Sequence, residues 1–130
     1  MRIRTLRLAG YIVGSDVYIS GDIKISDITS RRGNVIIGDR VSIGPGVIIV
    51  TDSSANNSKL TKIYPLISGT VQIEEDSWIS AGVIILPNVK IGRCSIIAAG
   101  SIVINDVPPF SLYGGIPAKL IKKIDNSLIS

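Results

Sequence analysis

Histidine and cysteine, two side chains that often act in catalysis and metal binding, are scarce in this chain of 130 residues. It contains no histidine, which excludes a histidine-ligated metal site. Its single cysteine, Cys94, has no obvious activating neighbour, so we expect an inert thiol at a turn. The chain also lacks a phosphate-cradling glycine loop and a cysteine cluster. No metal cofactor is therefore expected.

The charged residues give a modest excess of cations that is spread along the chain. The net charge is +4, with three arginines within residues 2–7 and three lysines within residues 119–123. Nucleic-acid binding typically needs a dense basic face interleaved with aromatic residues. Neither is present, so no nucleic-acid partner is expected. For the C-terminal lysines, a local anion site and plain solvation both remain open.

Two further observations concern the compartment. One cysteine cannot form an intrachain disulfide, which favours a reducing cytoplasm. No stretch approaches the roughly 18 uninterrupted apolar residues of a membrane span, and the first residues lack the apolar run of a signal peptide. We therefore expect a cytoplasmic protein without a membrane span.

The elements that must position any site are indicated by an aliphatic residue at every sixth position. The series is Val13, Ile19, Ile25, Ile37, Ile43, Ile49, Ile73, Ile79, Ile85, Ile91, Ile97 and Val103. A second small or branched residue follows four positions after most of these. Hexapeptide repeats of this kind predict a β-helix, an all-β solenoid that forms one domain over residues 1–130.

The six-residue period also predicts which residues stack. If each hexapeptide is a short strand plus a corner, three of them make one triangular coil of eighteen residues. Residues eighteen apart then form inward ladders, predicted as Ile19–Ile37–Ile73–Ile91 and Ile25–Ile43–Ile79–Ile97. Stiff β-branched side chains suit such ladders.

Two segments depart from the repeat, and such departures often carry function. Residues 29–34 put Arg31 on an inward position, where burial without a partner would be costly, so we expect the backbone to bulge there. Residues 51–70 replace about one coil with polar residues and a proline, which predicts a projecting loop.

The stretches 72–92 and 98–121 resemble the C-terminal half of the hexapeptide-repeat acyltransferases. They include Trp-Ile-Ser-Ala-Gly-Val from residue 78 and Gly-Gly-Ile-Pro-Ala-Lys from residue 114. The similarity extends over roughly residues 11–124 and is greatest to the maltose and galactoside O-acetyltransferases and to the acetyltransferases of polysaccharide biosynthesis. It implies a left-handed parallel β-helix and a homotrimer with active sites between subunits.

The resemblance also implies a donor, an acceptor and the residues that contact them. Acetyl-CoA is the implied co-substrate, and a sugar or nucleotide sugar is the implied acceptor, at a hydroxyl or an amine. The backbone at Ala81 and Ala99 would meet the pantetheine arm. Ile104 and Asn105 fall where the family often has Thr-Lys, and Lys122 falls where a basic residue meets the nucleotide phosphates. Small corner residues would also explain both alanines without a ligand.

Trp78 lies where the family commonly has a tryptophan. It would either wall the pantetheine channel or pack against a neighbouring subunit. The proline-containing segments at 108–109 and 117–119 predict the exit from the last coil and a short C-terminal helix. The apolar side chains of that cap, about residues 108–125, would cover the open end of the solenoid.

The family's general base is a histidine at the foot of the projecting loop, and the resemblance places that position at Ser54, give or take one residue. Serine cannot supply a base with a pKa near neutrality, which typically contributes about 10²–10⁴-fold to such a reaction. Three hypotheses remain: Asp52 acts as the base, the acceptor is an amine that needs little base catalysis, or the protein is an inactive scaffold. Asp52 and Ser54 also have simpler roles as loop-capping residues.

Overall fold

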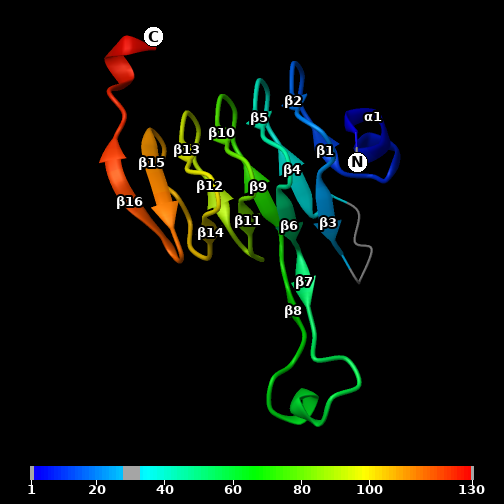
Figure 1. Cartoon of the computed structure of the whole chain (residues 1–130). Coiled ribbons are helices and arrows are strands. Elements are labelled where there is room, and N and C mark those ends of the chain that lie inside the picture. Colours follow the sequence, from blue (N-terminus) through cyan, green and yellow to red (C-terminus); the bar gives the residue numbers. More distant parts are fainter. Residues whose placement is uncertain (1, 28–32, 130) are drawn as a thin grey trace.

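The chain folds as a triangular solenoid of short strands, described here from a computed structural model that covers residues 2–27 and 33–129. Figure 1 shows the coils stacked side by side along one axis, with a long loop projecting from one edge. The strands of the coils form three sheets, and every pairing within the coils is parallel, while β7 (Asp52–Ser53) and β8 (Ile67–Ser68) form a separate two-stranded sheet. This is the left-handed parallel β-helix expected from the hexapeptide period.

Each sheet forms one face of the prism. The first sheet is ordered β1 (Ile12–Val13), β4 (Val35–Ile37), β9 (Val71–Ile73) and β12 (Lys90–Ile91). The second is ordered β2 (Tyr18–Ile19), β5 (Ser42–Ile43), β10 (Trp78–Ile79), β13 (Ile96–Ile97), β15 (Ser111–Gly115) and β16 (Ala118–Lys123). The third is ordered β3 (Lys24–Ser26), β6 (Ile48–Val50), β11 (Ile84–Ile85) and β14 (Ile102–Val103).

The core consists of the inward residues predicted from the period. From Ile37 to Val103, every member of the aliphatic series is at most 1% exposed. At the N-terminal end Val13 and Ile25 are only partly buried and pack against this core. Ser77, Ser95 and Ser101 are also buried, and their hydroxyls donate to the backbone carbonyls of Gly92, Pro108 and Ala98. Buried hydroxyls therefore keep the hydrogen bonds that burial would otherwise cost them.

The predicted ladders are correct from the second coil onward but wrong for the first coil. Ile37 pairs with Ile73 and Ile79 with Ile97, as predicted. Ile19, however, pairs with Ile43, and Ile25 with Ile49. Twelve residues separate Ile25 from Ile37 where a regular repeat has six, and this extra hexapeptide shifts the register. The predicted inward position of Arg31 lies in this segment, outside the described residues.

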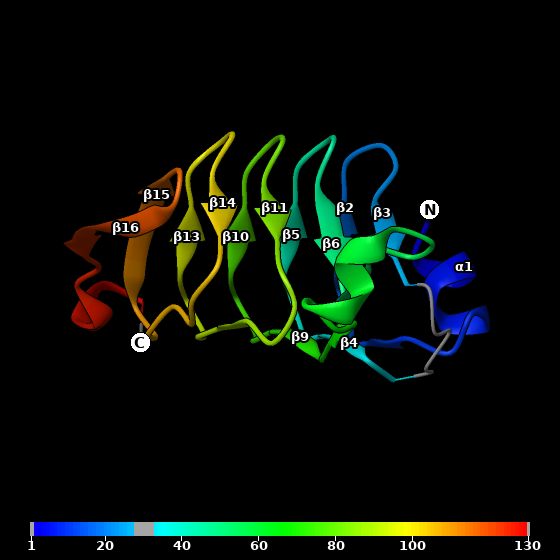
Figure 2. The same ribbon diagram turned by 90° about the horizontal axis from the view of Figure 1, so that it is seen from below.

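Both ends of the solenoid are covered by elements outside the repeat (Figure 2). Helix α1 (Ile3–Leu8) lies at the N-terminal end and buries Leu6 completely. Its arginine Arg7 donates from Nη2 to the carbonyl of Gly14 at 2.6 Å, which ties the helix to the first coil. The sequence did not predict this helix.

The predicted C-terminal helix is wrong, because residues 118–123 form strand β16 antiparallel to β15. The edge of β15 offers unpaired backbone groups, and pairing satisfies them at once. In the described residues that follow, up to residue 129, the structure has a 3-10 turn, η2 (Asn126–Leu128), and no α-helix. Leu120 and Ile121 remain about half exposed, so Ala118, at 8% exposed, is the part of β16 that is buried.

The departure at residues 51–70 is the projecting loop that the sequence predicts. Strands β7 (Asp52–Ser53) and β8 (Ile67–Ser68) form an antiparallel stalk, and the 3-10 helix η1 (Lys59–Lys62) lies near its tip (Figure 1). The loop inserts after β6 and leaves the stacking intact, since Ile49 still pairs with Ile85. The site residues around the loop are therefore positioned by regular coils.

Candidate functional site

The residues predicted to meet the pantetheine arm lie on one corner, between the second and third sheets. Ala81 and Ala99 are both exposed there, in successive coils. The neighbouring glycines Gly82 and Gly100 have φ values of +71° and +72°, which glycine adopts without the strain of a Cβ. Gly100 N donates to Ala81 O at 2.9 Å. The corner is thus a narrow ridge of small side chains that an extended ligand can approach closely.

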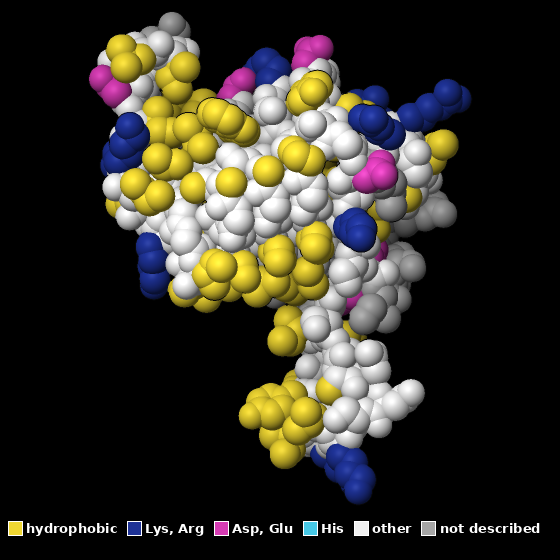
Figure 3. Space-filling view, in the orientation of Figure 1, with side chains coloured by type: hydrophobic (Ala, Val, Ile, Leu, Met, Phe, Trp, Pro, Cys, Tyr) yellow, Lys and Arg dark blue, Asp and Glu magenta, His cyan; other side chains and the backbone are white. Residues whose placement is uncertain are grey.

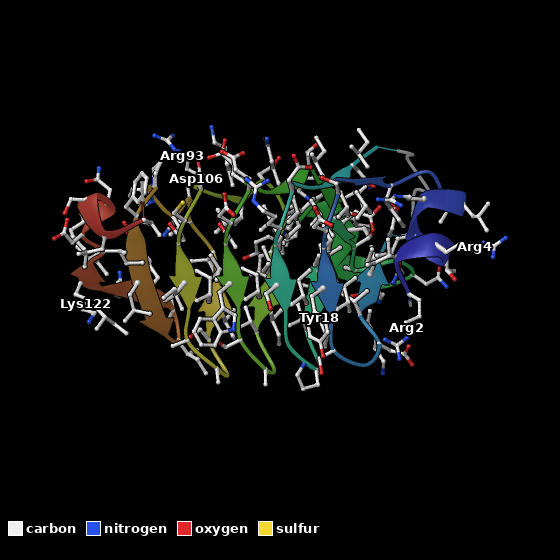
Figure 4. All side chains as sticks on the ribbon, turned by 90° about the horizontal axis from the view of Figure 1, so that it is seen from above. Arg2, Arg4, Tyr18, Arg93, Asp106 and Lys122 are labelled. Atoms are coloured by element: carbon white, nitrogen blue, oxygen red, sulfur yellow. The ribbon has the colours of Figure 1, made fainter. Side chains whose placement is uncertain are left out.

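This ridge does not include the other predicted cofactor residues. Ile104 and Asn105 are exposed but follow β14, at the far end of the third-sheet strand from Ala99. Lys122 is exposed and pairs with Leu112, whereas Lys119 pairs with Gly114 and so lies beside the end of β15 next to the ridge. Figure 4 shows Lys122 at the C-terminal end of the solenoid. The sequence indicates Lys119 only as one of the three C-terminal lysines that could form an anion site, whereas the strand pairing brings it nearer the ridge than Lys122.

The two predicted catalytic residues at the foot of the loop, Asp52 and Ser54, differ in their burial. Asp52 is only 1% exposed and lies in β7. Ser53, one residue on, is exposed, and Ser54 is partly buried. The Ser54 hydroxyl oxygen accepts a hydrogen bond from Asn56 N at 3.0 Å, the loop-capping role that the sequence also allows. Of these three, Ser53 has the side chain most open to a ligand.

The environment of Asp52 is connected to that of Tyr11. Tyr11 donates to Asp27 Oδ2 at 3.0 Å. Burial, the Asp27 bond and the negative charges of Asp27 and Asp52 together raise the pKa of Tyr11 to about 12. The charge of Asp52 therefore contributes to the raised pKa of Tyr11 inside the same chain.

The outer face of the second sheet carries two exposed aromatic residues. Tyr18 is 64% and Trp78 is 54% exposed, and both align with Ser42 between them. A cavity of about 630 Å³ lies beside Trp78 and also involves Cys94, Ile96 and Ile124. Burial is the main cause that raises the pKa of Cys94, which agrees with the inert thiol expected from the sequence.

An ion pair between neighbouring coils borders the same cavity. Arg40 donates to both carboxylate oxygens of Asp76, at 2.8 and 2.9 Å. The guanidinium holds the pKa of Asp76 below its usual range. Both residues occupy corner positions with positive φ, so the pair joins two stacked corners.

A second groove, of about 480 Å³, lies on the third sheet beside the foot of the loop. Its lining residues are Asp22, Ile23, Lys24, Ile25, Ser26 and Ile48. Thr51 N and Thr51 Oγ1 both donate to Ser26 O, at 3.0 and 3.2 Å. The groove is therefore contiguous with the segment that leads into β7.

The loop carries a large apolar surface that none of residues 2–27 and 33–129 covers. Figure 3 shows apolar side chains gathered on it beside cationic ones. The exposed fractions of the large apolar residues lie between 47% and 70% for Leu60, Ile63, Tyr64, Leu66 and Ile67. Exposed apolar clusters of this kind commonly mark contact surfaces.

Two features are absent from residues 2–27 and 33–129, a metal-binding cluster and a membrane-spanning helix. No group of three or more metal-binding side chains comes together there. No helix in that part of the chain has the length and apolar character needed to cross a membrane.

The fold and the repeats have clear counterparts among known proteins. Residues 70–105 match the family described as bacterial transferase hexapeptide (six repeats). The chain is 35% identical over 114 residues to a galactoside O-acetyltransferase of Lactococcus lactis, covering 88% of this chain and 53% of that protein. The corresponding protein of Escherichia coli is 33% identical, with 88% and 54% covered.

Solved structures of acetyltransferases show the same similarity at the level of the fold. A hexapeptide-repeat acetyltransferase from Vibrio cholerae has a TM-score of 0.77 at 32% identity, covering 89% of this chain and 64% of that chain. A structure of that protein complexed with acetyl coenzyme A has a TM-score of 0.65 at 29% identity, covering 92% and 74%. A galactoside acetyltransferase in complex with coenzyme A has a TM-score of 0.71 at 26% identity, covering 95% and 70%.

The predicted resemblance to the hexapeptide-repeat acyltransferases is thus confirmed, both in the repeats and in the fold. The chain spans about half the length of the curated relatives it matches.

Proposed function

We propose that the protein is an acyl-CoA-dependent acetyltransferase that acts on a sugar of surface polysaccharide biosynthesis in the cytoplasm. The observation that carries the proposal is the ridge at Ala81 and Ala99, where small side chains and glycines leave room along an exposed corner. An extended arm with amide groups can lie there and pair with backbone, as peptides pair with strand edges. Two relatives of the same fold are described in complex with acetyl coenzyme A or coenzyme A.

In this proposal the cationic side chains of β16 receive the nucleotide phosphates. Lys119, beside the ridge, and Lys122, three residues further along β16, both present exposed ammonium groups. A lysine supplies a compact charge with three donors, which suits a phosphate. Ile104 and Asn105 lie beyond the third-sheet strand, and a role for them requires the donor to reach across that face.

The foot of the loop decides which chemistry the site supports. Asp52 is buried, and the neighbouring exposed side chain is a serine, so no carboxylate at 52–54 faces the solvent. We therefore favour the amine acceptor over a hydroxyl acceptor with Asp52 as base. A neutral amine attacks the thioester carbon, the C–N bond forms, the C–S bond breaks, and CoA leaves as the thiol with the amine's proton. Orientation of the two substrates then supplies much of the rate.

The active assembly in this proposal is a homotrimer with sites between subunits. The loop exposes five large apolar side chains on a stalk, and burying them against a neighbouring copy recovers roughly 25 cal/mol for each Å² of apolar surface. This surface fits a partner of the same chain.

A scaffold without activity is the second candidate, and the absence of histidine from the sequence favours it. Thermal unfolding with and without acetyl-CoA tests the first step, binding of the donor, because a ligand that binds only the folded state must raise the melting temperature. Release of CoA thiol in the presence of an amino sugar then tests transfer. Stabilisation without thiol release for amine and hydroxyl acceptors alike leaves the scaffold as the better description.

A further inference from the structure

The outward row of the third sheet that borders this groove has one charged side chain among aliphatic ones. The register aligns Lys24 with Ile48, Ile48 with Ile84, and Ile84 with Ile102, so these four side chains project from the same face. Lys24 is exposed on β3, the edge strand of that sheet. The row therefore presents an apolar floor that ends in a single ammonium group.

The cation of Lys24 makes no ion pair or side-chain hydrogen bond with any residue in 2–27 or 33–129. Asp22 also lines the groove, but it has an interaction of its own within the chain. The groove thus contains a cation available to a ligand. Its stem can lie along Ile48 while the ammonium group stays accessible.

The position of Lys24 relative to the loop fits a substrate that spans both. Ser26 pairs with Val50, and Thr51 donates twice to Ser26, so the groove continues directly into β7. Two residues of extended strand, roughly 7 Å, separate Lys24 from Ser26. A sugar ring placed over Ile48 and Ser26 would point one end at Lys24 and the other towards Ser53.

We propose that the groove of Lys24, Ser26 and Ile48 binds the acceptor through an anionic group, so that the acceptor is a sugar carrying a phosphate or a carboxylate. The inference rests on the proposed function for its donor and deepens it by naming the acceptor class. A lysine ammonium with three donors matches an oxyanion, and the aliphatic neighbours exclude water from one side of the pair.

A simpler role for Lys24 competes with this one. Charged residues on edge strands, lysine above all, prevent strands of different molecules from pairing. That role requires only the charge and no ligand. The two roles make different predictions for sugar binding.

Calorimetric titration of the full chain distinguishes them, with two matched probe pairs: glucosamine 1-phosphate against glucosamine, and glucuronic acid against glucose. Inorganic phosphate alone is the fifth ligand. We expect at least one anionic sugar to bind more tightly than its neutral partner, and Lys24→Gln to weaken that binding roughly three- to tenfold while sparing the neutral sugar. Added salt should weaken the same difference. The two pairs separate a phosphate from a carboxylate source.

Lys90→Gln is the control, because Lys90 projects from the equivalent outward position of the first sheet. It should leave sugar binding unchanged, and thermal unfolding of both variants should show intact folding. The proposal is overturned if no sugar binds, if anionic and neutral sugars bind equally, or if Lys24→Gln keeps the preference. Inorganic phosphate binding as tightly as the sugar phosphate would also overturn the acceptor assignment.

The proposed function fails in a different way. If binding of glucosamine 1-phosphate depends on Lys24 but acetyl-CoA then releases no thiol with this bound amino sugar, the transferase proposal is wrong and the groove assignment stands.

Discussion

The phenol of Tyr11 donates a hydrogen bond to Asp27 Oδ2 at 3.0 Å, between the residue that precedes β1 and the residue that follows β3. The two residues belong to the first coil, next to the extra hexapeptide that shifts the register. Asp52, from the foot of the loop, adds its charge to this pair. The carboxylate considered as a catalytic base is thus electrostatically linked to the inside of the first coil.

This link makes a prediction for Asp52→Asn. Burial is the main cause that raises the pKa of Tyr11 to about 12, and the Asp52 charge is the smallest of the contributions. Removing that charge should lower the Tyr11 pKa by a modest amount, because the tyrosinate is repelled less. Ultraviolet titration of the four tyrosines, with Tyr11→Phe to assign the signal, measures it. An unchanged Tyr11 pKa would contradict the inferred electrostatic effect of Asp52 on Tyr11.

The same pKa makes a prediction for stability against pH. The folded-state pKa of about 12 lies above the ordinary 10.0, so the folded state holds this proton more tightly. Its contribution to stability is complete below pH 10 and is lost as the pH rises from about 10 to about 12. Tyr11→Phe should remove this loss. Urea unfolding of both proteins across that range tests the difference.

The apolar loop predicts how the assembly is held together. Ile63→Asn combined with Leu66→Asn should convert a trimer into smaller species, because both side chains are exposed in the single chain and would be buried between copies. Light scattering at micromolar concentration measures the mass. Leu8→Asn, at a residue 77% exposed on α1, is the control and should leave the mass unchanged. A wild-type monomer would refute the trimer itself.

The two lysines of β16 predict an order of effects on CoA binding. Lys119→Ala should weaken CoA more than Lys122→Ala, because Lys119 pairs with Gly114 beside the ridge. Each loss should be roughly 0.5–3 kcal/mol and should be smaller for a dephosphorylated analogue. Equal losses for both ligands would remove that lysine from the phosphate site.

The loop foot predicts where a histidine could restore a base. Ser53→His should raise transfer to a sugar hydroxyl more than Ser54→His, since Ser53 is exposed while Ser54 caps a turn through Asn56. A positioned base contributes about 10²–10⁴-fold, so a gain towards the lower figure is expected. Thiol release with a neutral sugar measures it. Two silent variants that still bind CoA would argue that more than the base is missing.

The six-residue period alone determined the solenoid, its inward ladders from Ile37 onward and the loop at 51–70. Each of these follows from local rules, because a β-branched residue every sixth position can be buried only if the coils stack. The same six-residue period also predicted that Cys94 lies at a turn. The resemblance then supplied the ridge at Ala81 and Ala99 as a candidate site.

Only the tertiary structure decided the register of the first coil, the fold of the C-terminal segment and the exposure of the candidate site residues. These features depend on contacts between residues that are distant in the sequence. Arg31 marked the break in the period, but the shift of the first coil by one repeat appears only in the strand pairing. Residues 118–123 pair with β15 because its edge was open, although their apolar and basic residues also suited a helix. The burial of Asp52 beside exposed Ser53, and the alignment of Lys24 with Ile48 across two coils, arise from strand register. Register is set by the whole stack, so the side chains that can meet a ligand emerge only when the coils are assembled.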